Sequence, residues 1–446
     1  MKHKNVMALL LIVAMSMGMM AGCGTDKTAE AGSQDAGDDN AKEESSDSGE
    51  TVTLTASVPS GDNMDTYQPV FDLAEEKLGI HIEVDIRPNG DDGDNLVKTR
   101  LASGDMADLM FYNTGSVFRN LNPAEYLVDI SDWDVADKLD DNFKQAASVD
   151  GKLYGVPSGA STTGGIFYNK EKYEEYGLSV PKTWDEFLAN CDKIKEAGDD
   201  AVIGSFADSW TAQIPYLGDF YMVNKNEPDF AKNFEAGTAK HATSEVAIKS
   251  WKKMADLHDY YNEDYLATTY DDACDKLANG EGVHYMMLSS MLANVESLYG
   301  KEATDNIGFF PIPGETEDDL GLTVWASGGI YGNKNSDKLD DVKRFMEFWV
   351  SDEALDAFCS KVTPCGTFHV DYTAENSFPA VSEDMKKYTD EGKSTLAMEF
   401  VTAVKGPNCE SFCCEVGSGQ CTPEEGAAGY DEDCKKQAMQ LGLDWK

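Results

Sequence analysis

Hydrophobic side chains between residues 51 and 112 follow two periods in turn. Residues 52–58 and 80–86 alternate apolar and polar positions, which predicts two strands. Between them, apolar residues recur at spacings of three and four from Tyr67 to Leu78, which predicts a helix. A second helix over 96–101 and a third strand over 108–112 follow. This order predicts a parallel sheet of βαβ units, with ligands at the carboxyl ends of its strands.

Two local signals mark elements further along the chain. Asp150-Gly151 is a hairpin dipeptide. Thr183 and Glu186 have the spacing of a capping box ahead of an amphipathic helix that contains Trp184. Trp184, Trp251 and Trp349 lie at helical spacing among apolar neighbours, so we expect all three in the core. The alternation of predicted strands and helices along the chain gives an α/β fold class.

The N-terminus has the pattern of an export signal. Two lysines precede an apolar run over 6–20, which is too short to span a bilayer and fits a signal-peptide core. The run ends in Met20-Ala21-Gly22-Cys23, which resembles the bacterial lipobox and implies acylation of Cys23 after removal of residues 1–22. An ordinary secretory signal with an incidental cysteine is the alternative. Residues 23–50 are mostly Gly, Ser and acidic residues and predict a solvated tether.

Charge narrows the choice of ligands. The chain has 81 acidic and 37 basic residues and a net charge of −44, which argues against nucleic acid as a partner. Only four of the basic residues are arginines, and a phosphate clamp would need nearly all of them. Phosphorylated ligands are therefore disfavoured.

The sequence contains no clear catalytic or metal-binding motif. The six histidines include no pair at i, i+4, and no G-x-S-x-G elbow occurs. The run 91–95 lacks the register of a calcium loop and is interpreted as an acidic surface turn. Cys409 and Cys413 lack a C-x-x-C pattern or a nearby histidine. We therefore expect no catalytic residue, no metal and no cofactor.

Ten cysteines leave nine after lipidation of Cys23, an odd number. Cys359 and Cys365 could form a bridge around Pro364. Five more cysteines cluster over 409–434, and their pairing stays open.

A series of segments resembles one family. GKLYGVP, FYNK and PKTWDEF occur in that order after Asp150, SGDMADLMFYN precedes them, and NGEGVHYMM and GGIYGNKNSDKLDDVKRFMEFWVSDEAL follow. Together they resemble the extracellular solute-binding proteins of ABC transporters, which include sugar and oligosaccharide receptors. The resemblance implies two α/β lobes that close on a ligand between them. Lobe one would comprise 51–157 plus 324–370, and lobe two 158–323 plus 371–446.

Candidate ligand-binding residues are polar or aromatic side chains in the loops of these lobes. A sugar needs aromatic faces for its C–H surface and polar groups for its hydroxyls. The candidates are Ser60, Asp62, Asn63, Tyr112, Asn113, Ser158, Asp208, Trp210, Ser289, Trp325 and Ser327. For Trp210 and Trp325, a core position and a site position are about equally well supported. Many sugar-binding relatives have Gly and Trp where this chain has Leu288-Ser289-Ser290-Met291, so Ser289 is expected as a polar contact instead of a stacking platform.

These features predict a lipid-anchored, extracytoplasmic, monomeric receptor that binds a carbohydrate and delivers it to an ABC permease. The alternatives are a surface glycoside hydrolase, or a receptor for a peptide, a polyamine or a metal.

Overall fold

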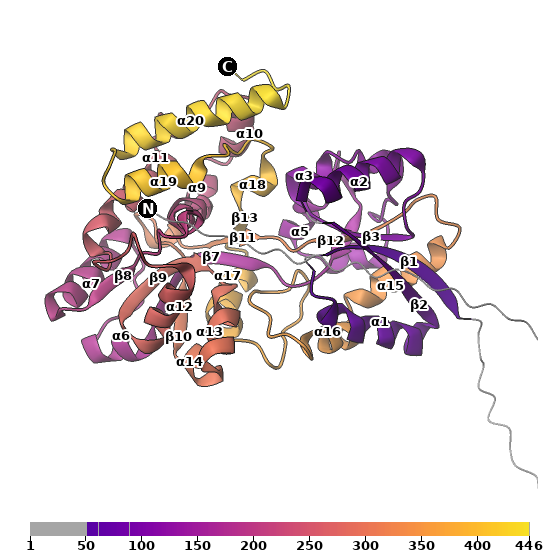
Figure 1. The fold of residues 1–446 in the computed structure, drawn as a ribbon, viewed down its shortest axis with the longest axis horizontal. Helices are drawn as coiled ribbons and strands as arrows, with labels where there is room; N and C mark the ends of the chain where they lie inside the picture. Colours follow the sequence, from indigo (N-terminus) through magenta and orange to yellow (C-terminus); the bar gives the residue numbers. More distant parts are fainter. Residues whose placement is uncertain (1–50, 61, 89, 446) are drawn as a thin grey trace, which may run out of the picture. The chain divides into compact units, whose positions relative to one another are not determined.

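The computed structural model describes residues 51–445 except 61 and 89. The predicted signal peptide, Cys23 and the tether lie outside the described residues. The described chain forms two α/β lobes, each built on one main sheet (Figure 1). Among the helices of the described residues, none combines the length and the hydrophobicity that a membrane span requires.

Lobe one is built on a five-stranded sheet in the order β2-β1-β3-β12-β6. Its first three strands are β1 (Val52–Pro59), β2 (Ile80–Arg87) and β3 (Leu109–Tyr112), and both β2 and β3 pair with β1 in parallel. The predicted βαβ arrangement is confirmed. β12 (Gly329–Gly332) is antiparallel to both β3 and β6 (Gly155–Pro157). The helices of this lobe are α1 (Met64–Leu78), α2 (Gly90–Ser103), α3 (Gly115–Arg119), α4 (Pro123–Tyr126), α5 (Asp141–Ala146), α15 (Leu339–Trp349) and α16 (Asp352–Cys359).

Two turns in lobe one test the sequence predictions. Asp150 and Gly151 both have positive φ and join β4 (Ser148–Val149) to β5 (Lys152–Leu153), which confirms the hairpin. The interpretation of residues 91–95 as a surface turn was wrong, because α2 begins at Gly90 and includes them. Gly and Asp have low helix propensity, so the first turns of this helix could not be predicted from the sequence.

Lobe two is built on a sheet in the order β13-β11-β7-β9-β8, with β10 added to β7. The strands are β7 (Thr162–Asn169), β8 (Asp200–Ile203), β9 (Gly282–Leu288), β10 (Ile307–Phe310), β11 (Leu322–Trp325) and β13 (Ser394–Leu396). Helices on and around this sheet are α6 (Lys170–Tyr176), α7 (Trp184–Ala197), α8 (Ile214–Leu217), α9 (Phe220–Asn226), α10 (Phe230–Glu235), α11 (Ile248–Asp256), α12 (Tyr270–Asn279), α13 (Met291–Tyr299), α14 (Lys301–Asp305), α17 (Lys386–Asp390) and α18 (Met398–Val401).

The last two helices complete lobe two. α19 (Cys409–Gly417) and α20 (Pro423–Gln440) pack on each other and on α11, and in Figure 1 they form the yellow pair above the second sheet. Trp251 of α11 is fully buried in this cluster. Trp184 and Trp349 are also buried, so the prediction that these three tryptophans belong to the core is confirmed.

The start of α7 differs in one detail from the predicted capping box. The Thr183 hydroxyl accepts the Glu186 amide at 3.3 Å, as expected. The Glu186 carboxylate, however, accepts the Lys182 amide at 2.7 Å, one residue before the N-cap. Only half of the reciprocal pair therefore forms at this helix.

The chain passes between the lobes three times. It leaves lobe one between β6 and β7 and returns between β11 and β12. These two passages are joined by the Ser158 amide, which donates to Gly328 O at 2.9 Å. Val324 and Trp325 pair with β7 in the second sheet. The third passage follows α16, since Ala374 belongs to the core of lobe one and Phe378 to a core of lobe two.

Residues just before the third passage form hydrogen bonds with the other two passages between the lobes. The Ser161 amide and hydroxyl donate to Thr367 O at 2.9 and 2.8 Å. His369 accepts the Ser327 amide through Nε2 at 3.4 Å, while its Nδ1 contacts Asp140 at 2.9 Å. The three connections therefore form one hydrogen-bonded hinge.

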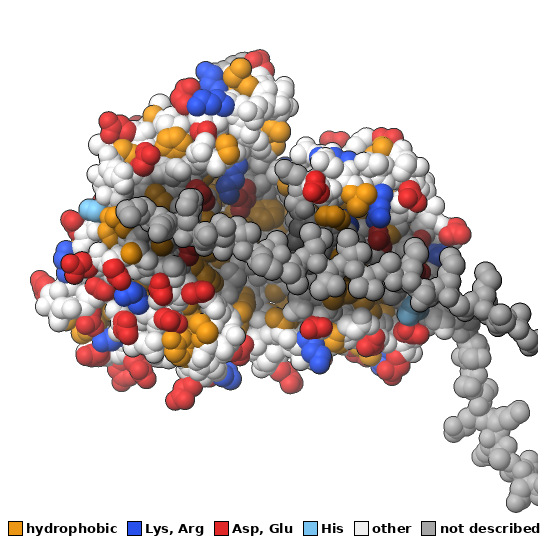
Figure 2. All heavy atoms as spheres, viewed as in Figure 1, with side chains coloured by type: hydrophobic (Ala, Val, Ile, Leu, Met, Phe, Trp, Pro, Cys, Tyr) orange, Lys and Arg blue, Asp and Glu red, His pale blue; other side chains and the backbone are white. Residues whose placement is uncertain are grey.

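All nine cysteines in the described part of the chain are free thiols, including Cys359 and Cys365. The bridge considered between those two is therefore not formed. Acidic side chains are spread over both lobes on the face drawn in Figure 2.

Candidate functional site

A cavity of about 600 Å³ lies where the strands of lobe one end and the hinge begins. Asp62 follows β1, Tyr112 ends β3 with Asn113 next to it, and Ser158 follows β6. Ser327, on the second passage, completes this group. Parallel strands bring their carboxyl ends to one edge of a sheet, which explains why residues so far apart in sequence meet here.

The floor of this cavity is a network of charged and phenolic groups. The Tyr67 hydroxyl donates to Asp62 at 3.0 Å, and the Tyr112 hydroxyl donates to Asp94 at 2.8 Å. Arg87 is buried, and its guanidinium lies 5.6 Å from the centre of the Tyr112 ring. Arg87 donates to the Ser57 and Phe111 carbonyls. Within the described residues it makes no ion pair with a carboxylate.

Burial sets the electrostatics of this floor. Desolvation raises the pKa of Asp62, although the bond from Tyr67 and the charge of Arg87 act in the opposite direction. Desolvation lowers the pKa of Arg87, against the attraction of Asp62 and Asp94. A cavity with one buried cation and two carboxylates offers both donors and acceptors to a polar solute.

A second cavity, of about 310 Å³, adjoins the first. Asn113, Ser327 and Gly328 line both cavities. Thr114 and Ser116 of lobe one, and Glu399 and Lys405 of lobe two, line the second one. Together the two cavities form a cleft between the lobes, which we call the interlobe cleft.

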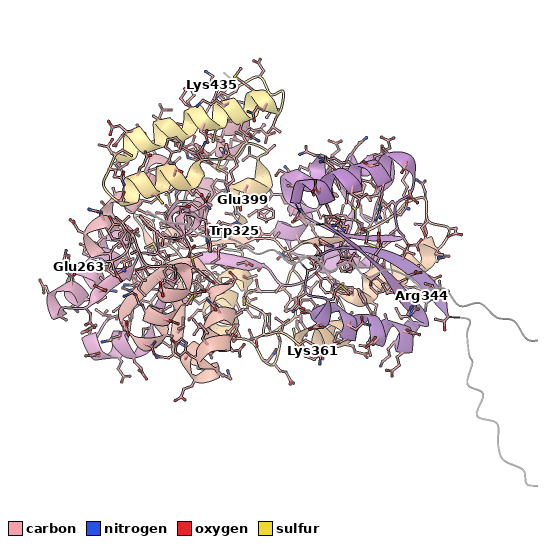
Figure 3. All side chains as sticks on the ribbon, in the orientation of Figure 1. Glu263, Trp325, Arg344, Lys361, Glu399 and Lys435 are labelled. Atoms are coloured by element: carbon pink, nitrogen blue, oxygen red, sulfur yellow. The ribbon has the colours of Figure 1, made fainter. Side chains whose placement is uncertain are left out.

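Five of the predicted site residues therefore come together in the interlobe cleft: Asp62, Tyr112, Asn113, Ser158 and Ser327. Trp325 lines neither cavity but lies against the second one, since its indole N–H donates to the Glu399 carboxylate (Figure 3). Its ring packs over Gly164 of β7, where a Cβ would come within 2.8 Å of it.

The remaining predicted residues lie elsewhere. Ser60 is exposed, and Asn63 caps α1 by accepting the Asp65 amide at 3.1 Å. Ser289 is fully buried, and its hydroxyl accepts the Thr163 amide at 3.0 Å. This hydroxyl is hydrogen-bonded to the backbone of β7 and lines neither cavity of the interlobe cleft.

Asp208 and Trp210 form a separate feature of lobe two, beyond the end of β8. Trp210 is 36% exposed, and its ring lies 5.4 Å from that of Tyr270. Asp208 accepts the Tyr270 amide at 2.7 Å, so it fixes one aromatic residue against the other. This exposed aromatic pair does not line either cavity of the cleft.

Several cleft residues were missed by sequence reasoning. Arg87 ends β2, the strand next to β1, so the rule that ligands bind at strand ends pointed to it. Asp94 was assigned to a surface turn, although it lies in α2. Glu399 and Lys405 follow the third passage, and no local pattern marks them. Within the described residues, no group of three or more His, Cys, Asp or Glu side chains could hold a metal ion.

Two further cavities contain none of the predicted site residues. One, of about 370 Å³, lies beside Asp140 and the segment 364–374. The other, of about 530 Å³, lies in lobe two and is lined by Trp184 and three lysines of α11. Neither of these two cavities of the described residues lies at the strand ends of lobe one, where the interlobe cleft meets the hinge.

Comparison with known proteins agrees with this architecture. Residues 70–387 match the family model described as bacterial extracellular solute-binding protein. The chain belongs to this family. The family resemblance and the two-lobe fold expected from the sequence are thereby confirmed, and the chain is a solute-binding protein that acts outside the cytoplasm.

Individual relatives are distant. The chain is 23% identical over 295 residues to the multiple sugar-binding protein of Streptococcus mutans, covering 65% of this chain and 68% of the relative. It is 26% identical over 204 residues to the melibiose/raffinose/stachyose-binding protein MelE of Bacillus subtilis, covering 46% of this chain and 42% of MelE. The match thus spans less than half of the MelE chain.

Among solved structures, the apo form of RafE from Streptococcus pneumoniae superposes with a TM-score of 0.73 at 19% identity. The superposition covers 87% of this chain and 99% of RafE. At this identity the likeness establishes the shared fold.

Proposed function

We propose that this solute-binding protein captures a carbohydrate in the interlobe cleft and delivers it to an ABC permease. One observation carries the proposal: the cavity at the strand ends of lobe one, about 600 Å³ in volume, is lined by aromatic, charged and hydrogen-bonding side chains beside the hinge. Small-molecule sites are typically about 300–1,000 Å³ in volume.

The chemistry of the cavity suits a neutral ligand with many hydroxyl groups. Asp62 and Asp94 accept hydrogen bonds, Arg87 donates them, and Asn113 and Ser158 can do both. A buried hydroxyl without a partner costs about 1–3 kcal/mol, so a dense set of polar groups favours a sugar over an apolar solute. The rings of Tyr67, Tyr112 and Phe358 line the same cavity and supply apolar surface for sugar C–H groups.

The relatives support the same ligand class. The Streptococcus mutans relative is named a multiple sugar-binding protein, and MelE of Bacillus subtilis is named for the binding of melibiose, raffinose and stachyose. We propose by the same reasoning that the protein performs no chemistry on its ligand.

Titration calorimetry with a panel of sugars tests the proposal. The panel comprises glucose, galactose, maltotriose, melibiose, raffinose and stachyose, with a tripeptide and spermidine as non-sugar ligands. Saturable heat with at least one sugar, and recovery of that sugar intact by chromatography, is the expected result. Because Asp62 and Asp94 both line the cavity, hydrolysis products would indicate a glycoside hydrolase instead. Heat with the tripeptide or spermidine alone would exclude the carbohydrate.

The remaining parts of the proposal concern anchoring and assembly. We propose that Cys23 is lipidated, that the protein is a monomer, and that the lobes divide close to the expected boundaries at 157/158, 323/324 and 370/371. Labelling with a fatty-acid analogue tests the anchor: Cys23→Ser should abolish incorporation, whereas undiminished labelling would refute it. The two chains of a diacyl group give firm membrane attachment.

A further inference from the structure

Glu399 forms a polar unit with Trp325 and Lys405 on the lobe-two side of the interlobe cleft. The Trp325 indole N–H donates to one carboxylate oxygen of Glu399, and Lys405 Nζ donates to the other. The side chains of Glu399 and Lys405 are 26% and 38% exposed, and both line the second cavity. The two charges therefore compensate each other at the cavity surface.

This unit has spare hydrogen-bonding capacity. A carboxylate offers about four lone-pair positions, and an ammonium group offers three donors. Within the described part of the chain, Glu399 accepts two side-chain hydrogen bonds and Lys405 donates one. Both groups can therefore contact a ligand without giving up their mutual bond.

The backbone of Glu399 links the unit to the opposite lobe. The Ser116 hydroxyl, at the start of α3, donates to Glu399 O at 3.1 Å. Gly115 beside it approaches Phe400 so closely that a Cβ would lie 2.8 Å from the Phe400 ring. These contacts hold α18 against lobe one at the edge of the second cavity, which fixes the position of the Glu399 side chain relative to Asn113 and Ser327.

We propose that Glu399 and Lys405 are specificity-determining residues of the solute site, binding two neighbouring hydroxyl groups of the ligand as acceptor and donor. The inference rests on the proposed carbohydrate function. A paired acceptor and donor matches a vicinal diol, in which one hydroxyl donates to the carboxylate and the next accepts from the ammonium group. A ligand seated over Asn113 and Ser327 would thus contact both lobes.

The test measures the affinity of the tightest-binding sugar of the panel for Glu399→Gln and Lys405→Met. Lys405→Met removes the charged donor, and since hydrogen bonds to charged groups contribute about 1.5–3 kcal/mol it should raise Kd about 10- to 100-fold. Glu399→Gln keeps an acceptor oxygen and loses only the charge, so it should raise Kd about 5- to 10-fold. Lys405→Met also serves as the second variant if Glu399→Gln does not fold.

Glu391 and Lys393 provide matched controls, because they form an ion pair at 2.8 Å with 56% and 43% side-chain exposure and line neither cavity of the cleft. Glu391→Gln and Lys393→Met should leave Kd within about twofold of the wild type. Wild-type affinity in folded Glu399→Gln and Lys405→Met would overturn the inference and leave the carbohydrate proposal intact. Absence of binding by the wild type to every sugar would overturn both.

Discussion

Lys253 and Asp219 form an ion pair in the interior of lobe two. Their side chains are 6% and 0% exposed, and Lys253 Nζ lies 2.7 Å from Asp219. Ser250 donates to the second carboxylate oxygen at 2.7 Å, and Lys253 also donates to Pro313 O at 2.6 Å. Burial raises the pKa of Asp219 even with these partners present.

Lys253→Met should therefore lower the free energy of unfolding by about 3–5 kcal/mol, because it leaves a buried carboxylate without its cation. Urea denaturation at pH 7 measures the change. Lys182→Met is the control, since Lys182 and Glu317 are 58% and 64% exposed and their pair should contribute less than about 1 kcal/mol. Equal losses in the two variants would contradict the argument from burial.

Asp431 should make stability depend on pH. Its carboxylate is buried and accepts the His241 and Ala242 amides, each at 2.9 Å. Desolvation nevertheless raises its pKa from 3.8 to about 6. Between about pH 4 and pH 6 the folded state binds more protons at this site than the unfolded state does, so its contribution to stability falls as pH rises.

The expected loss across this window is up to about 3 kcal/mol, from a shift of about two pKa units. Urea midpoints of the wild type and Asp431→Asn, measured from pH 4.5 to 7.5, isolate the contribution. The stability of the wild type relative to the variant should decline with rising pH and then level off. Thr243→Ala, an exposed position without a titratable group, should differ from the wild type by the same amount at every pH, and a flat difference for Asp431→Asn would disprove the assignment.

At the scale of elements, α12 and α7 begin with different caps. At α12 the Thr269 hydroxyl accepts the Asp272 amide at 3.1 Å, and the Asp272 carboxylate accepts the Thr269 amide at 3.1 Å. At α7 only the bond from the Glu186 amide to the Thr183 hydroxyl is present.

The Thr269 hydroxyl also donates to the Asp272 carboxylate at 2.7 Å, so Thr269→Ala loses two side-chain hydrogen bonds and Thr183→Ala loses one. Thr269→Ala should therefore destabilise the protein more than Thr183→Ala, within the range of about 0.5–2 kcal/mol for lost N-caps. Unfolding in urea compares the two variants with Thr243→Ala, an exposed position that should change by less than about 0.5 kcal/mol. If Thr183→Ala costs more, the additional hydrogen bond from the Thr269 hydroxyl to Asp272 does not stabilise the helix.

Local sequence patterns predicted those strands, helices and turns that depend on residues close together in the chain. β1, β2 and β3 were readable because alternation and helical spacing succeed one another, and Asp150-Gly151 was readable because both residues tolerate positive φ. The start of α2 was not readable, because its Gly and Asp residues are poor helix formers.

The site was less predictable because it is assembled from distant segments. Asp62, Tyr112 and Ser158 could be found as polar or aromatic residues after strands. Ser289 follows a strand in the same way, yet its hydroxyl serves the Thr163 amide inside the protein. Glu399 lies at the cleft because the chain passes between the lobes a third time. No periodic pattern of hydrophobic residues predicts that passage.

For the whole molecule, ligand binding should raise the melting temperature and compact the protein. A ligand at about 100 times its Kd stabilises the folded state by about 2.7 kcal/mol. Shared over roughly 400 residues at about 2.1 cal/mol/K each, this corresponds to a shift of about 3 °C. Calorimetry with the tightest-binding sugar measures the shift, and small-angle scattering should show a smaller radius of gyration. A sugar without calorimetric binding heat is the control, and a thermal shift without compaction would mean that binding does not close the lobes.

The position of β12 has a consequence for biosynthesis. β12 lies between β3 and β6 in the first sheet, although residues 158–328 separate it from β6 in the chain. At about 5–20 residues per second, a ribosome needs roughly 10–35 s to synthesise that stretch. During this interval β3 and β6 have no strand between them, so the lobe that begins first is completed late. Nascent chains that terminate before Gly329 should therefore yield no separately folded half and should depend on chaperones to remain unaggregated.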